Sequence, residues 1–71
     1  MLETLRQALL QRRKLRVEYS DSQQRASRRI LLPLALYSWG TTWSLAAWCE
    51  SPGDFRNFRL DRICNLEVLV L

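Results

Sequence analysis

The segment RNFRLDRI, residues 56–63, carries the side chains with the clearest chemical potential in this sequence. Arg56, Arg59 and Arg62 stand three residues apart, with apolar residues between them that can anchor the segment in a core. Guanidinium groups form paired hydrogen bonds with phosphate oxygens, so a row of them suits an anionic ligand. We therefore predict that these three arginines contact phosphate.

A second group of arginines, Arg25, Arg28 and Arg29, lies upstream. If the fold brings the two groups together, they form an arginine-lined groove suited to phosphates, in which we expect Arg28 to be a further contact. The alternative is that Asp61 pairs with a neighbouring arginine and the segment is only a solvated, charged rim.

The stretch TTWSLAAWC, residues 41–49, has the alternation of a strand with two different faces. One face carries the larger apolar and thiol side chains and is predicted to face the core: Trp43, Leu45, Ala47 and Cys49. Ser44 and Trp48 are then predicted to face outward and to line the ligand surface. Trp48 either stacks on a base or packs under a helix.

Composition excludes several classes of function. The chain has 71 residues, no histidine and two cysteines, Cys49 and Cys64, without the paired spacing of a metal site. No nucleophile has a base nearby, so we expect neither an enzyme nor a cofactor. Apolar runs are too short to span a bilayer, which predicts a cytoplasmic protein without a membrane partner. The net charge of +4, with ten arginines among eleven cations, favours an anionic partner.

Hydrophobic periodicity predicts one N-terminal helix followed by about five short strands. The helix is expected over about residues 2–14, and the strands over about 15–20, 25–32, 41–49, 54–60 and 66–71. Pro33 is expected to end the second strand, because proline cannot donate to a ladder. Short connections between short strands predict a single mainly β domain, a small antiparallel sheet curled into a barrel.

Two segments, a basic run at the end of the helix and an apolar run at the C-terminus, each allow two interpretations. The run Arg12-Arg13-Lys14 ends the predicted helix, where cations complement the helix dipole; contact with nucleic acid is the minority interpretation. The C-terminal LEVLVL is apolar enough to need covering, either by pairing within the barrel or by a dimer contact.

The sequence resembles the WYL domain of bacterial transcriptional regulators. The resemblance rests on LRVEYSD (15–21), RRILLPLALYSWGTTWSLAAWC (28–49) and RNFRLDRI (56–63). It implies an Sm-like or SH3-like barrel that follows a helix-turn-helix DNA-binding domain and binds a nucleic-acid or nucleotide ligand, single-stranded DNA in some members. We expect the DNA-binding domain in a parent chain, since this sequence contains none.

The signature Trp-Tyr-Leu of that family reads Trp43-Ser44-Leu45 here. A tyrosine can stack and form hydrogen bonds, whereas serine can only form hydrogen bonds. Two hypotheses follow: a ligand-sensing domain that binds an anionic effector through an arginine-lined groove, or a homodimerisation module without a nucleic-acid ligand. A homodimer is compatible with both.

Overall fold

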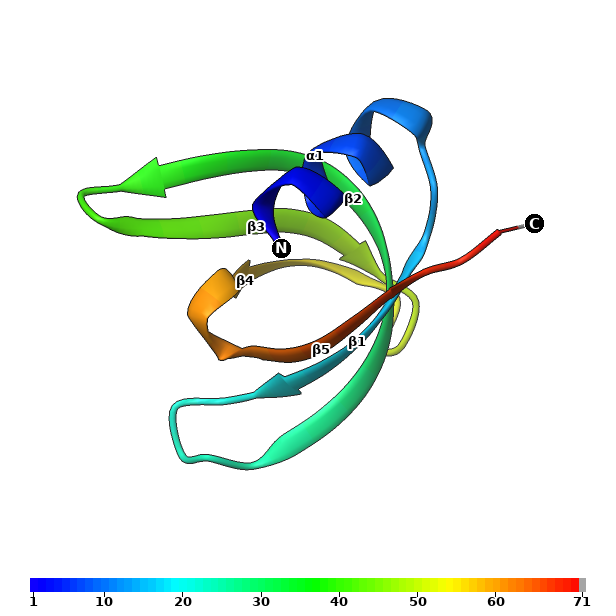
Figure 1. Ribbon diagram of the computed structural model, residues 1–71. Helices are drawn as coiled ribbons and strands as arrows, with labels where there is room; N and C mark the ends of the chain where they lie inside the picture. The colour runs from blue at the N-terminus through cyan, green and yellow to red at the C-terminus, as the bar shows by residue number, and fades with distance from the viewer. Residues whose placement is uncertain (71) are drawn as a thin grey trace.

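The computed structural model describes residues 1–70 and consists of one helix and one curved antiparallel sheet (Figure 1). The elements, in chain order, are α1 (Leu2–Gln11), β1 (Leu15–Ser20), β2 (Ala26–Trp39), β3 (Thr42–Cys49), β4 (Asp54–Arg59), the 3-10 turn η1 (Leu60–Arg62) and β5 (Ile63–Val68). The predicted mainly β architecture, one helix followed by five antiparallel strands, is confirmed.

The sheet is open. Its strand order is β4-β3-β2-β1-β5, so β4 and β5 are the two edge strands. Figure 1 shows η1 carrying the chain from one edge to the other, where a closed barrel would have a ladder between them. The predicted barrel is therefore not closed, although the sheet is strongly curved. The Arg59 backbone N–H donates to the Tyr19 hydroxyl at 3.2 Å, a side-chain link between β4 and β1.

One core fills the concave side of the sheet. Its largest fully buried side chains come from the helix and three strands: Leu5, Leu15, Leu31, Leu45, Val17 and Cys49. The helix packs against β2 and contributes Leu5 and Ala8 to the same cluster. Burying this apolar area is the main source of stability for so small a domain.

The helix ends three residues earlier than predicted, at Gln11. Arg12 takes the left-handed conformation (φ 55°, ψ 42°), which stops the helix. The backbone N–H groups of Arg12 and Arg13 then donate to the carbonyls of Leu9 and Ala8. The predicted continuation of the helix through Lys14 is wrong, because this backbone cap ends the helix before it reaches Lys14.

Pro33 does not end its strand. The pairing of β2 with β3 shifts register between Pro33 and Ala35, and the strand continues to Trp39. Pro33 pairs with Ala47, and the next residue, Leu34, is left outside the ladder. Such a bulge beside a proline lets the strand continue past it. The strand predicted over 25–32 is thus one long strand that runs from Ala26 to Trp39.

Two residues of β3 differ from the prediction in their exposure to solvent: Trp43 was expected to be buried and Ser44 to be exposed. Trp43 is 39% exposed, because it pairs with Ser38 near the hairpin tip, beyond the point where β4 stops covering β3. Ser44 is only 9% exposed, because the much larger Tyr37 and Arg59 flank it in the adjacent strands. Alternation places residues on two faces but does not say how much of each face its neighbours cover.

The last strand begins earlier than predicted, at Ile63, and ends at Val68. Leu66 and Val68 are half-buried and pack against the core, so part of the apolar C-terminal segment is covered within the domain. The predicted strand over 66–71 also included Leu71, which lies outside the described residues. No helix within residues 1–70 is long and apolar enough to cross a membrane.

Candidate anion-binding groove

The charges of the domain leave four arginines without a carboxylate partner among the described residues. Each of the seven Asp and Glu side chains lies within 4.0 Å of a different Arg or Lys. Of the eleven cations, seven are used in this way, and the remaining four are Arg12, Arg13, Arg29 and Arg62. These four account for the net charge of +4.

Arg29 is the arginine that the fold turns inward. It lies opposite Val17 in the β1–β2 ladder, and Val17 is fully buried, so Arg29 is on the concave face of the sheet. The side chain is half-buried. Burying a guanidinium without a carboxylate is unfavourable unless its N–H groups find other acceptors.

The acceptors of Arg29 are all uncharged, and the two oxygen acceptors are at long range. Its Nη1 lies 3.4 Å from the Ser51 carbonyl oxygen and 3.4 Å from Cys49 Sγ, and its Nε lies 3.3 Å from Ser27 Oγ. Its guanidinium carbon is 6.0 Å from the centroid of the Phe58 ring. Such contacts hold the group in place but leave its charge available for an anion.

A groove of about 260 Å³ opens beside Arg29, between the β1–β2 hairpin and β4. We call it the inner groove. It is lined by Tyr19, Asp21, Arg25, Ala26, Ser27, Arg29, Arg56, Asn57 and Phe58. Three arginines from two separate parts of the chain therefore converge on one groove, together with polar groups that can orient a ligand.

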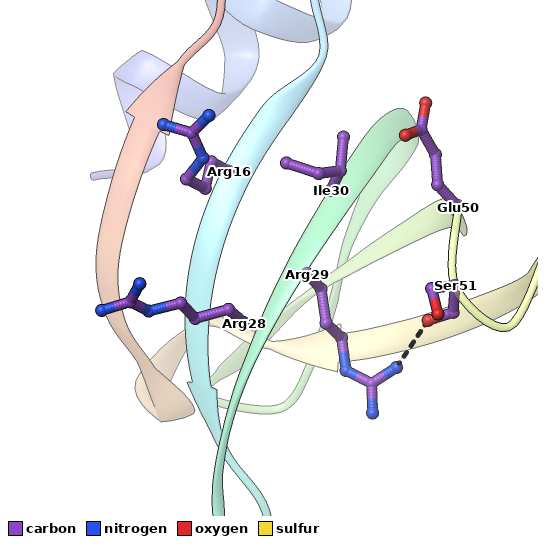
Figure 2. A pocket seen from close by; sticks show the side chains of 6 residues that line it. All are labelled: Arg16, Arg28, Arg29, Ile30, Glu50 and Ser51. Atoms are coloured by element: carbon purple, nitrogen blue, oxygen red, sulfur yellow. Dashed lines mark hydrogen bonds between the residues drawn. The ribbon is translucent and has the colours of Figure 1, made fainter.

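A second hollow, also about 260 Å³, shares Arg29 and lies on its other side; we call it the rim hollow (Figure 2). It is lined by Arg16, Arg28, Arg29, Ile30, Glu50 and Ser51. Figure 2 shows Arg29 turned toward Ser51, whereas Arg16 and Arg28 extend the other way, across β1. Arg16 and Arg28 are paired with Glu67 and Glu18, so the rim hollow is close to neutral apart from Arg29.

The turn at the end of the inner groove is held by Asp21. Its carboxylate accepts the backbone N–H groups of Gln23 and Arg25, both at 2.9 Å. The Arg25 backbone N–H is the main cause that lowers the pKa of Asp21, and desolvation opposes it only in part. The carboxylate therefore stays ionised and fixes the turn that carries Arg25 into the groove.

The predicted contacts Arg56 and Arg28 reach different places. Arg56 lies opposite the buried Ala47, so it is on the concave face and lines the inner groove; its Nε is 3.9 Å from Asp54. Arg28 lies on the convex face with its side chain 80% exposed, and it lines the rim hollow.

The predicted contacts Arg59 and Arg62 line neither hollow. Arg59 forms a two-pronged ion pair with Asp61, with its Nη2 2.6 Å and its Nε 3.1 Å from the two carboxylate oxygens. This hydrogen bonding lowers the pKa of Asp61 and raises that of Arg59. Arg62 is half-buried in η1. The alternative raised from sequence, that Asp61 pairs with a neighbouring arginine, is confirmed for Arg59.

Ser44 and Trp48 do not line the inner groove either. Both lie on the face of β3 that alternates with the core residues Leu45 and Ala47. Trp48 is half-buried against Phe55, with ring centroids 4.7 Å apart in an edge-to-face arrangement. A role for these two residues in ligand binding stays a prediction.

Arg29 was not among the ligand contacts predicted from the sequence, where it was named only as one of three upstream arginines. A signal for it was present: Arg29 stands two residues before Leu31, on the same face of the strand as that core residue. An arginine at an inward position is the unusual event that marks a site. Among residues 1–70, no cluster of three or more potential metal-ligating side chains is formed.

The chain matches known proteins over most of its length. The family model of the WYL domain matches residues 1–68. Two curated relatives, both described as the DNA-binding transcriptional repressor CapW of Escherichia coli, one from strain KTE188, are 38% identical over 48 residues. That alignment covers 68% of this chain and 16% of each relative.

A solved structure shows the same fold. Proteasome accessory factor B/C (PafBC) of Arthrobacter aurescens superimposes with a TM-score of 0.88 at 40% identity, covering 94% of this chain and 11% of that one. The chain thus spans a small fraction of the proteins it matches. The resemblance to WYL domains inferred from sequence is confirmed.

Proposed function

This chain belongs to the WYL domain family, and on that premise we propose that it is a ligand-sensing regulatory domain of a bacterial transcriptional regulator. Its ligand is a phosphate-bearing effector, a nucleotide or a single-stranded nucleic acid, which binds in the inner groove. The domain acts by binding and not by catalysis, in the cytoplasm, where such a regulator meets its DNA.

The observation that carries this proposal is the position of Arg29. It is half-buried on the concave face, has no carboxylate partner among the described residues, and is held by three neutral acceptors at 3.3–3.4 Å. A phosphate that enters the groove replaces these long contacts with short, charge-assisted ones. Arg25 and Arg56 line the same groove, each paired with a carboxylate, Asp21 and Asp54, so Arg29 supplies its unpaired charge.

The size and lining of the groove indicate how the ligand binds. Its volume of about 260 Å³ is below the ~300–1,000 Å³ of pockets that enclose a whole drug-sized molecule. We therefore assign it to one phosphate and the sugar attached to it, with the rest of the ligand outside. Ser27 offers a hydrogen bond to the sugar or base edge.

The relatives support the regulatory context. CapW is a DNA-binding transcriptional repressor several times longer than this chain. By analogy, we propose that this domain is joined to a helix-turn-helix DNA-binding domain in its parent protein. A ligand held by Arg29 would alter the contact between the two domains and so change DNA affinity.

A titration of the domain with short ligands tests the proposal. Fluorescence anisotropy with a labelled single strand of about 12 thymidines, competed by thymidine monophosphate and by thymidine, should show binding that needs phosphate. The logarithm of affinity should fall linearly with the logarithm of salt concentration. Equal competition by thymidine and its monophosphate would contradict a phosphate site.

A second candidate function, homodimerisation, is favoured by one surface feature. Phe55 is 67% exposed beside the half-buried Trp48, on the convex side of the edge strand β4. An exposed aromatic side chain next to an open sheet edge is a feature of interaction surfaces. This surface is separate from the inner groove, so both functions can operate in one protein.

A further inference from the structure

Two of the four arginines without a carboxylate partner are adjacent at the end of α1. Arg12 and Arg13 follow Gln11 directly, and neither lies within ion-pair distance of an Asp or Glu among the described residues. Neither lines the inner groove or the rim hollow. The proposed effector site therefore leaves both of these charges unexplained.

Capping of the helix does not use these side chains. The last carbonyls of the helix are satisfied by main chain: Arg12 N–H donates to Leu9 at 3.2 Å and Arg13 N–H donates to Ala8 at 2.9 Å. The Arg13 side chain donates to the amide oxygen of Gln11 at 2.8 Å, a neutral acceptor. Any residue with a backbone N–H could form this cap, so it gives no reason for two arginines.

The backbone at Arg12 is unfavourable for an arginine. Its φ of 55° lies in the left-handed region, where glycine is preferred and a side chain with a Cβ is disfavoured. For the cap alone, glycine would serve better. The arginine at this position therefore supplies something other than helix termination.

The two side chains border a pocket. It has a volume of about 270 Å³ and is lined by Gln11, Arg12, Arg13, Lys14, Leu32 and Leu69. The chain ends of two elements meet here, since Leu69 N–H donates to the Lys14 carbonyl at 2.9 Å. Lys14 itself is paired with Glu50, so the uncompensated charge belongs to Arg12 and Arg13.

We propose that Arg12 and Arg13 form a second anion site that contacts the phosphodiester backbone of a nucleic acid, separately from the inner groove. Two neighbouring guanidinium groups can hold consecutive phosphates, each through paired hydrogen bonds. The helix C-terminus opposes an anion with a partial charge of only about half a unit, which two full positive charges outweigh. Leu32 and Leu69 provide an apolar surface for a sugar or base.

Substitution of Arg12 by glycine separates this role from a structural one. Arg12→Gly relieves the left-handed strain, so the midpoint of thermal unfolding should rise by about 2–5 °C. The same variant should bind a single strand of about 12 thymidines several-fold more weakly. The slope of the logarithm of affinity against the logarithm of salt concentration should become less steep. The expected decrease in its magnitude is about 0.7 for Arg12→Gly and about 1.4 for Arg12→Gly combined with Arg13→Gln.

The matched control is Arg6→Gln. Arg6 is on the same helix, is paired with Glu3 at 3.4 Å, and its loss changes the net charge equally. Its salt slope should equal that of the unchanged domain. An equal loss of affinity in Arg6→Gln would mean that only net charge matters and would overturn the site.

Failure of this site and failure of the effector groove can be told apart. Arg12→Gly should leave competition by thymidine monophosphate unchanged, because the mononucleotide occupies the groove. In an Arg29→Gln background, the loss of salt slope caused by Arg12→Gly should persist. A more stable Arg12→Gly variant with wild-type oligonucleotide affinity, or equal competition by polyglutamate of matched charge, would refute the proposal.

Discussion

The guanidinium carbon of Arg29 lies 6.0 Å from the centroid of the Phe58 ring. Phe58 is 2% exposed and stacks edge-to-face on Tyr19, with centroids 5.1 Å apart. The distance is at the outer limit of about 6 Å for a cation–π attraction. Two aromatic rings, Tyr19 and Phe58, thus lie at the boundary of the core. Arg29, which we propose as the ligand contact, lies over the Phe58 ring.

Removing the Phe58 ring should destabilise the domain strongly. We expect Phe58→Ala to lower the free energy of unfolding by about 3–5 kcal/mol, because it empties a fully packed position. That is a large share of the stability expected for a chain of this size. Urea denaturation followed by tryptophan fluorescence measures the change. Phe58→Leu, which retains most of the volume, should cost clearly less; equal losses in the two variants would contradict a packing role.

Stability should fall in acid, in part because of Asp21. Hydrogen bonds from the Arg25 and Gln23 backbones lower the pKa of Asp21 below its ordinary value of 3.8. The stabilisation is therefore present above pH 3.8 and is lost as pH falls through the lower folded-state pKa. Thermal unfolding from about pH 5 to about pH 2 should show a smaller acid loss for Asp21→Asn than for the unchanged domain. Parallel curves would contradict this role.

If the ligand binds in the inner groove, as we propose, the serine of the signature position should not contribute to its affinity. Ser44 is 9% exposed and lies on the face of β3 opposite to the inner groove. We expect Ser44→Ala to change affinity for thymidine monophosphate less than twofold and unfolding free energy by less than about 1 kcal/mol. Anisotropy competition and urea denaturation give the two values. A tenfold loss of affinity with unchanged stability would place Ser44 in the ligand site after all.

Self-association through the Trp48–Phe55 surface should depend on Phe55. Phe55→Ser removes a side chain that is 67% exposed, so the fold should persist while any dimer weakens. Light scattering over a range of concentrations measures the association. Leu10→Ser, at another exposed apolar position on α1, is the control. Equal dimerisation of Phe55→Ser and the unchanged domain would exclude this surface.

Most of the fold could be predicted because its strands alternate clearly. Leu15 and Val17 are fully buried as the alternation indicates, and the left-handed Arg12 moved the helix end by only three residues. The errors have local causes. Pro33 lies next to a bulge at Leu34 that no propensity predicts, and Trp43 is exposed because β4 is too short to cover it.

Less of the site could be predicted, because a groove depends on which strands face each other across the sheet. Of the predicted contacts, Arg56 lines the inner groove together with Arg25 and Arg29 of the hairpin, whereas Arg28 lines the rim hollow. Arg28 and Arg29 differ by one position, and in a strand one position reverses the face. Asp61 also neutralises Arg59 locally, which separates that arginine from the groove.

The affinity of Arg29→Gln for thymidine monophosphate, compared with that of Arg28→Gln, tests the central claim most directly. Both substitutions remove one positive charge from neighbouring positions of β2, but Arg28 is 80% exposed and already paired with Glu18. We predict at least a tenfold loss for Arg29→Gln, the loss of about one charge-assisted hydrogen bond, and less than a threefold loss for Arg28→Gln. Wild-type affinity in a folded Arg29→Gln domain would contradict the assignment of the inner groove.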